Sequence, residues 1–109
     1  MQGFKEITPA ESQEMQSVGN LRLIDVRSDA EVARGLIQGA LHIPLQLLPP
    51  KAGEWDSATP TVFYCQSGAR SAQACAFFAG KGFSNLYHLL GGVNAWVRSG
   101  LPLTAAAAT

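Results

Sequence analysis

The sequence predicts an α/β domain with a largely parallel sheet. Short β-prone runs alternate along the chain with segments that have helix start signals, which is the order found in βαβ units. Of the 109 residues, 47% are apolar, enough to bury a core without disulfides or a metal. We see no internal repeat or linker, so residues 1–109 are expected to form one domain with its core over about 4–103.

Helix start and stop signals divide the first half of the chain. Thr8 and Glu11 form a capping box with Pro9 at the first helical position, and Ser28 and Glu31 form a second box. The elements expected, in order, are a strand over 4–7, a helix ending at Gly19-Asn20, a strand over 21–26, a helix of about two turns stopping at Gly35, and a short strand over 41–43.

Prolines and glycines divide the second half in the same way. Pro49-Pro50 cuts off a helical turn over 45–48, and the polar segment 51–60 is typical of a surface connection. The remaining elements expected are a strand over 61–64 ending in Cys65, a helix over 71–80 broken by Gly82, a strand over 86–89, and a helix that follows Gly91-Gly92, contains Trp96 and is terminated by Gly100 and Pro102. The tail 104–109 is too short for a helix of its own and is expected to fray.

Charge and targeting features argue against several function classes. Eight basic residues balance eight acidic ones, so net charge favours neither nucleic acid nor a membrane surface as partner. The start of the chain lacks the apolar run of a signal peptide, and no apolar stretch is long enough to span a bilayer. A cytoplasmic protein is therefore expected. No Cys/His cluster has zinc spacing, so a structural metal site is not expected. No cofactor is predicted.

The segment from Cys65 to Ser71 contains the residues for which we predict a chemical role. It joins the end of a strand to the start of a helix, where open α/β sheets place their binding crevices. Small residues there can turn their N–H groups inward as an anion-binding nest, and Arg70 closes this cradle with a fixed charge. Cys65 and Arg70 are thus the predicted catalytic residues. The predicted substrate-binding residues are Gln66, Ser67, Gly68, Ala69 and Ser71.

The two cysteines are expected to behave differently. In the cradle, the pKa of Cys65 should fall below the roughly 8.5 of a free thiol, so that no separate base is needed to form the nucleophilic thiolate. The alternative, a buried core cysteine, rarely precedes an anion nest closed by arginine. Cys75 shares a helix face with Phe78, so both should be buried and Cys75 inert, while Phe77 should be more exposed.

Several motifs together resemble the rhodanese family, from about Ile7 to Pro102. The loop has the family's Cys-x-x-Gly-x-Arg-Ser/Thr pattern. The other matching segments are Asp25-Val26-Arg27, Glu31 with residues 35–44, and Gly91-Gly92 with Trp96, Gly100 and Pro102. Leu36 and His42 depart from the pattern, standing where the family usually has histidine and asparagine, and we interpret both positions as structural.

The resemblance implies a five-stranded, mainly parallel sheet flanked by helices on both faces. It implies a sulfurtransferase that moves a sulfane sulfur from thiosulfate or a low-molecular-weight persulfide to a thiol or cyanide acceptor, through a persulfide on Cys65. The partners implied are a small sulfur donor and a small acceptor, or an acceptor protein. Because Arg70 is present, the resemblance favours thiosulfate-like or persulfide donors over mercaptopyruvate.

Two other function classes remain as alternatives. Cysteine phosphatases have five residues between nucleophile and arginine, whereas four separate Cys65 from Arg70, and no aspartate is placed as an obvious general acid. By resemblance, the shorter loop suits a single sulfur atom rather than a tetrahedral phosphate. A non-enzymatic sulfur carrier or partner-binding module is the second alternative. Its purely non-catalytic form, known in relatives that have lost the cysteine, does not fit a chain that keeps it.

Other polar residues can be explained by structure alone. Asp25 and Arg27 are interpreted first as a structural ion pair, and Glu31 first as a capping residue, although each could line the site. His42 and His88 follow apolar strand patterns and have no partner at recognisable spacing, so both are expected to be structural or surface histidines. Tryptophans 55 and 96 are expected to act in packing, the first in a surface connection and the second against the sheet.

Overall fold

A computed structural model of the chain, which describes residues 3–105, contains five strands paired in parallel in the order β1-β5-β4-β2-β3. The strands are β1 (Lys5–Ile7), β2 (Arg22–Asp25), β3 (Leu41–His42), β4 (Thr61–Tyr64) and β5 (Leu86–Leu89). The helices are α1 (Pro9–Val18), α2 (Asp29–Val32), α3 (Ala69–Gly80) and α4 (Gly92–Arg98), with 3-10 helices η1 (Leu45–Leu47) and η2 (Pro49–Gly53). The α/β prediction is confirmed. Within the described residues no helix has the length and apolar character needed to cross a bilayer.

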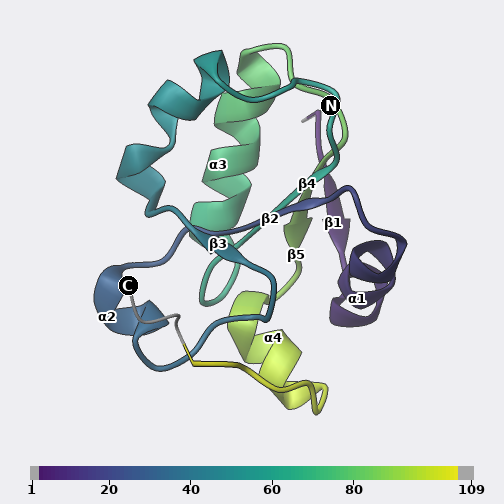
Figure 1. The fold of residues 1–109 in the computed structure, drawn as a ribbon, viewed down its shortest axis with the longest axis vertical. Coiled ribbons are helices and arrows are strands. Elements are labelled where there is room, and N and C mark those ends of the chain that lie inside the picture. Colours follow the sequence, from purple (N-terminus) through teal and green to yellow (C-terminus); the bar gives the residue numbers. More distant parts are fainter. Residues whose placement is uncertain (1–2, 106–109) are drawn as a thin grey trace.

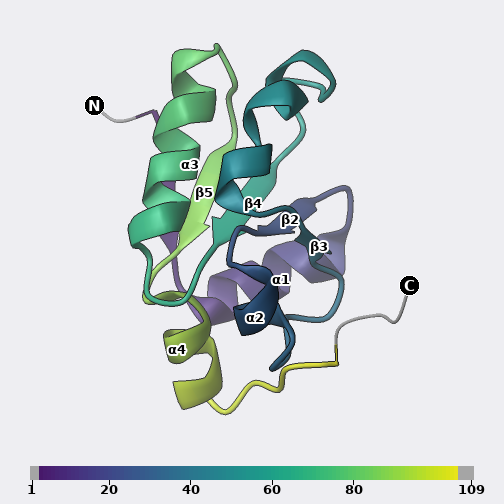
Figure 2. The same ribbon diagram turned by 90° about the vertical axis from the view of Figure 1, so that its left-hand side faces the viewer.

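Helices cover both faces of the sheet. In Figure 2, α3 lies in front of the strands and α1 behind them, with α4 below; Figure 1 gives the perpendicular view. Alternate residues along β4 and just after it point to opposite faces. Phe63 and Cys65, the residue that follows β4, lie in the core under α3, and Val62 and Tyr64 lie in the core under α1 and α4. All four residues of β4 are buried, as expected for the central strand of a parallel sheet.

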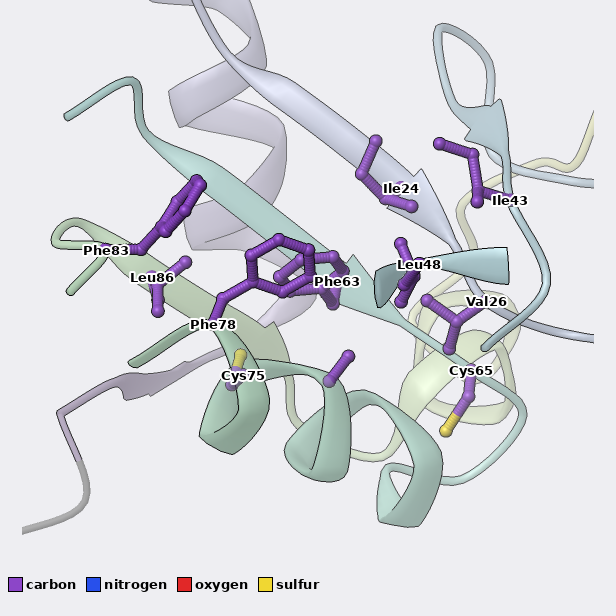
Figure 3. Close-up of a cluster of buried hydrophobic side chains, with 11 residues drawn as sticks. Ile24, Val26, Ile43, Leu48, Phe63, Cys65, Cys75, Phe78, Phe83 and Leu86 are labelled. Carbon is purple, nitrogen blue, oxygen red and sulfur yellow. The ribbon is translucent and has the colours of Figure 1, made fainter. Parts of the chain in front are cut away.

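An aromatic stack fills the core under α3 (Figure 3). The Phe78 ring stacks on Phe63 with centroids 5.3 Å apart and meets Phe83 edge-on at 4.9 Å. Trp55 stacks on the same Phe78 ring at 5.4 Å. The segment 51–60 is therefore more than a surface connection, because its tryptophan packs on the core.

The helix start signals are confirmed, but several boundaries differ from the prediction, and β1, β2 and β3 are each one or two residues shorter than expected. Both capping boxes form, at Thr8 and at Ser28. The helix after Ser28 has one turn rather than two, because the N–H groups of Arg34 and Gly35 bond the carbonyls three residues back, of Glu31 and Val32, instead of continuing the α-helical pattern. Pro49 begins a second 3-10 helix, where a proline needs no N–H partner. α3 begins at Ala69, two residues before the predicted start at Ser71.

Thr104, the first residue of the predicted tail, pairs with Leu36. Leu36 and Thr104 exchange two backbone hydrogen bonds of 2.9 and 2.8 Å and form an antiparallel bridge. The prediction that the chain frays from residue 104 is therefore wrong at Thr104, because a segment 68 positions away in the sequence supplies its partner. Residues 106–109 of the predicted tail lie outside the described residues.

The prediction of which face of α3 is buried is correct. Cys75 and Phe78 have no exposed surface and face the sheet (Figure 3). Phe77 is half-buried and meets Phe78 edge-on at 5.2 Å, so it is the more exposed of the two rings.

Tyr64→Phe should destabilise the fold by about 1–3 kcal/mol. The Tyr64 hydroxyl accepts a 3.0 Å hydrogen bond from the N–H of Ile37, and both residues are at most 1% exposed. Removing the oxygen leaves a buried N–H without a partner. Urea unfolding should show a lower midpoint with an unchanged slope.

Tyr87→Phe removes the same atom from β5 and is the matched control. Tyr87 is half-buried, and its hydroxyl makes no hydrogen bond within residues 3–105, so its loss should cost less than about 0.5 kcal/mol. Equal losses in the two variants would contradict the role given to the Tyr64 hydroxyl.

Candidate active site

Cys65 lies at the carboxyl end of β4, beside the first turn of α3 (Figure 3), as the sequence predicts. The residue is 1% exposed. The Gly68 N–H donates to its Sγ at 3.0 Å, and the Ser71 hydroxyl oxygen lies 3.7 Å from Sγ. Gly68 has a φ of 121°, which glycine adopts without the strain other residues would incur. The loop therefore curls around the sulfur with its donors directed inward.

Two opposing effects act on the pKa of the Cys65 thiol. Burial raises the pKa, because a sulfur anion loses its hydration. The backbone N–H groups of Ser71, Gly68 and Ser67, together with the Ser71 hydroxyl, lower it. The hydrogen bonds outweigh burial, and the pKa lies below its ordinary value. The site thus favours the thiolate, which is the nucleophilic form.

The start of α4 packs directly on the cysteine loop. The N–H groups of Val93 and Asn94 donate to the carbonyls of Cys65 and Gln66 at 2.9 and 3.1 Å. A Cβ added at Gly92 would lie 2.4 Å from the Cys65 carbonyl oxygen, and the φ of Gly92 is 58°. Only glycine permits this approach, so the Gly-Gly motif is needed to hold the loop.

A buried ion pair supports the loop from the side of β2. The guanidinium of Arg27 binds both carboxylate oxygens of Asp25 at 2.8 to 3.1 Å, and its side chain is 3% exposed. The same guanidinium donates to Gln66 Oε1 at 3.3 Å, and Gln66 Nε2 donates to Asn94 Oδ1 at 2.6 Å. The pair is structural, as interpreted from the sequence, and it positions the side chain of Gln66.

Arg70 lies at the rim of the loop and forms a two-pronged ion pair with Glu31. Both guanidinium–carboxylate distances are 2.8 Å, and the two side chains are about one-third exposed. The hydrogen bonds from Arg70 hold the pKa of Glu31 at about 2, although burial opposes this. The pKa of Arg70 is raised by Glu31 and also by the nearby Cys65. Glu31 is therefore both a capping residue and the partner of the predicted cationic group.

The structure gives His88 two partners that sequence reasoning missed. Its Nδ1 lies 3.2 Å from the Ser71 hydroxyl, and its Nε2 lies 3.2 Å from a carboxylate oxygen of Glu6. His88 is 5% exposed, which confirms a structural rather than a surface position. Its partners lie 17 and 82 positions away, so no local spacing could have indicated them. His42 is also held, with Nε2 2.7 Å from the carbonyl oxygen of Arg27.

A hollow of about 710 Å³ lies next to the loop. Its lining includes Gln66 from the loop, Glu31, and three arginines, Arg27, Arg34 and Arg98. Arg34 and Arg98 are exposed and form no ion pair within the described residues, so the hollow is positively charged. Among residues 3–105, no group of three or more His, Cys, Asp and Glu side chains could hold a metal ion.

Cys75 is buried like Cys65, but the pKa of its thiol is shifted in the opposite direction. Burial raises the pKa of its thiol to about 12, and the S–H group contacts the carbonyl oxygen of Tyr87 at 3.3 Å. The thiol therefore stays protonated at neutral pH, which supports the expectation that Cys75 is inert.

Known proteins resemble the chain along almost its whole length. A sulfurtransferase from Allochromatium vinosum is 42% identical over 94 residues, 86% of this chain and 88% of that protein. A thiosulfate sulfurtransferase GlpE from Actinobacillus succinogenes is 34% identical over 103 residues, 94% of this chain and 93% of that protein.

Solved structures share the fold. A rhodanese-related protein from Thermoplasma volcanium has a TM-score of 0.82 at 26% identity, covering 94% of this chain and 99% of that one. A Rhodopseudomonas palustris protein, named as of unknown function and a possible tyrosine phosphatase, has a TM-score of 0.80 at 25% identity, covering 93% and 85%. The family model for the rhodanese-like domain matches residues 8–99. Since that match covers more than half of the chain, this protein belongs to the rhodanese-like domain family.

Proposed function

We propose that this protein is a sulfurtransferase that holds a sulfane sulfur on Cys65 as a persulfide. The observation that supports this most directly is the Cys65 sulfur itself, buried yet with a lowered pKa inside a loop of N–H donors. Relatives named sulfurtransferase and thiosulfate sulfurtransferase, similar over most of their length, support the same reaction.

The first half-reaction loads the sulfur. The Cys65 thiolate attacks the outer sulfur of thiosulfate, a new S–S bond forms, and the S–S bond of thiosulfate breaks. Sulfite leaves with the electron pair, and the charge of the attacking thiolate passes to the terminal sulfur of the persulfide. The N–H groups that lower the pKa of Cys65 are those of Ser67, Gly68 and Ser71, and they are available to stabilise this persulfide anion.

The second half-reaction delivers the sulfur. An acceptor thiolate or cyanide attacks the terminal sulfur of the persulfide, and the bond to Cys65 breaks. The thiolate of Cys65 is regenerated, with the same hydrogen bonds that favoured it before loading. Two free cysteines, one of them a reactive thiolate, fit a reducing compartment, so we place the reaction in the cytoplasm.

Arg70 assists the anionic donor in this scheme. Its guanidinium binds Glu31, and its five N–H donors leave capacity for a second acceptor at the rim of the loop. An incoming sulfite group can therefore share the guanidinium with Glu31. The charge that develops on sulfite as it leaves is stabilised by the same group.

The charged hollow beside the loop suits the part of a larger donor or acceptor that does not react. Its volume of about 710 Å³ exceeds what one thiosulfate needs, and Arg34 and Arg98 offer two cations to carboxylates. A persulfide with carboxylates, or an acidic segment of an acceptor protein, fits this chemistry.

Brief incubation with thiosulfate should make the intact protein heavier by one sulfur atom, and cyanide should remove that sulfur. Intact-mass spectrometry and peptide mapping should place the sulfur on Cys65. Cys65→Ser should abolish both steps, because an alcohol is not ionised at neutral pH, while Cys75→Ser should leave them largely intact. Sulfur mapped to Cys75, or hydrolysis of an aryl phosphate in place of sulfur transfer, would reject the proposal.

Arg70→Ala should lower kcat/KM for thiosulfate by about 10- to 100-fold, the effect of losing a charged hydrogen-bond donor. Arg70→Lys should recover part of this, since it keeps the charge but loses the fork. Lys81→Ala removes a positive charge just beyond the other end of α3 and should have no effect. Full activity in Arg70→Ala would mean that the backbone donors suffice.

The double variant Arg34→Ala/Arg98→Ala should raise KM for glutathione persulfide about 3- to 10-fold, as expected for two exposed charge contacts. KM for thiosulfate should stay unchanged, because thiosulfate is too small to extend into the hollow. Steady-state assays with the two donors test this, and parallel changes for both donors would contradict it.

A further inference from the structure

We propose that His88, held by Glu6, accepts the proton of Cys65 through the hydroxyl of Ser71, so that the resting nucleophile is a thiolate linked to an imidazolium. This inference rests on the proposed function in one respect, because sulfur transfer is the reaction in which the Cys65 thiolate would act. The proton transfer itself can be measured without any sulfur donor. His88 acts through Ser71 and is therefore a positioning residue.

Three contacts form an unbroken path from the sulfur. Cys65 Sγ lies 3.7 Å from Ser71 Oγ, Ser71 Oγ lies 3.2 Å from His88 Nδ1, and His88 Nε2 lies 3.2 Å from a Glu6 carboxylate oxygen. Ser71 has no exposed surface and His88 is 5% exposed, so the two central members are shielded from bulk water. The Glu6 end is open, with 59% of its side chain exposed.

The fold brings these four groups together from separate elements. Glu6 and His88 are direct partners in the parallel pairing of β1 with β5, and Ser71 projects from the first turns of α3. Cys65 follows β4, the strand beside β5. The path therefore depends on the strand order of the sheet.

The transfer needs no proton donor or acceptor outside these four residues. Before transfer, the Cys65 S–H donates to Ser71 Oγ, the Ser71 O–H donates to His88 Nδ1, and the His88 Nε2–H donates to Glu6. The Ser71 proton then moves to Nδ1 and the Cys65 proton replaces it on the Ser71 oxygen. Afterwards Ser71 donates to the sulfur anion and the imidazolium donates to Ser71 and to Glu6. One proton has moved from sulfur to the ring and the net charge is unchanged.

The surroundings of His88 favour this transfer. The titratable groups that face it are Glu6 from β1 and, through Ser71, Cys65 at the end of β4. The ring of Phe4 meets the imidazole edge-on at 5.7 Å. The Glu6 carboxylate stabilises the imidazolium, since a cation buried without a counterion is costly. The Gly68 carbonyl, 3.1 Å from the Ser71 oxygen, competes for the hydroxyl hydrogen and keeps Ser71 oriented.

The test is the pH dependence of Cys65 alkylation by iodoacetamide in Cys75→Ser protein, with and without further changes. His88→Asn can still hydrogen-bond Ser71 but cannot accept a proton. The midpoint of the alkylation profile should shift upward by about one pH unit, so that at a pH below both midpoints the rate falls about tenfold. At pH 10 the rates should be equal, since the thiol is ionised in both proteins.

Glu6→Gln tests the same path at its exposed end. Because the Glu6 side chain is mostly exposed, this substitution should not disturb folding. The alkylation midpoint should shift upward by a smaller amount than in His88→Asn. Glu14→Gln changes the same charge on the exposed face of α1 and should leave the midpoint unchanged.

A purely structural role for His88 would give a different result. Such a role predicts a lower unfolding temperature and lower rates at every pH, with the midpoint where it is in the parent protein. An unchanged midpoint in both His88→Asn and Glu6→Gln would overturn the inference. Failure of the proposed sulfur transfer would instead appear as a normal alkylation profile without persulfide formation.

Discussion

The Cys65 sulfur is removed from water, and its ionisation depends on hydrogen bonds from its own loop. Burial alone would raise the pKa of the thiol, and the donors from Ser67, Gly68 and Ser71 reverse that effect. Such donors stabilise an anion only while the loop keeps one shape, since each must point at a single atom. Much of the surrounding structure can be understood as support for that shape.

Two supports act on the loop from opposite sides of the sheet's carboxyl edge. The start of α4 approaches closely enough for Val93 and Asn94 to bind loop carbonyls, which is possible only with glycine at position 92. The buried Arg27 binds Asp25 and reaches the side chain of Gln66. Motif residues that make no contact with the sulfur therefore have a physical role in the site. Replacing them would disturb the donors without touching the reacting atoms.

Two pairs of ionisable side chains lie beside the loop, Arg70 with Glu31 and His88 with Glu6. Glu31 holds Arg70 at its rim, and in the proposed reaction the anionic donor shares that cation with the carboxylate. On the other side, His88 contacts Glu6 through one ring nitrogen and the hydroxyl of Ser71 through the other, and Ser71 itself lies against the sulfur. In the reaction proposed above, the Arg70–Glu31 pair acts on the charge of the substrate, and His88 with Glu6 acts on the charge of the nucleophile.

The sequence by itself determined the features that depend on neighbours along the chain. The capping boxes at Thr8 and Ser28, the strand ending at Cys65 and the buried face of α3 follow from patterns a few residues long, and the structure agrees with each. The pairing of Thr104 with Leu36, the ion pair of Arg70 and both partners of His88 were decided by the tertiary structure. Each depends on a group that strand order and packing bring near from a distant part of the chain, and no local pattern records that proximity.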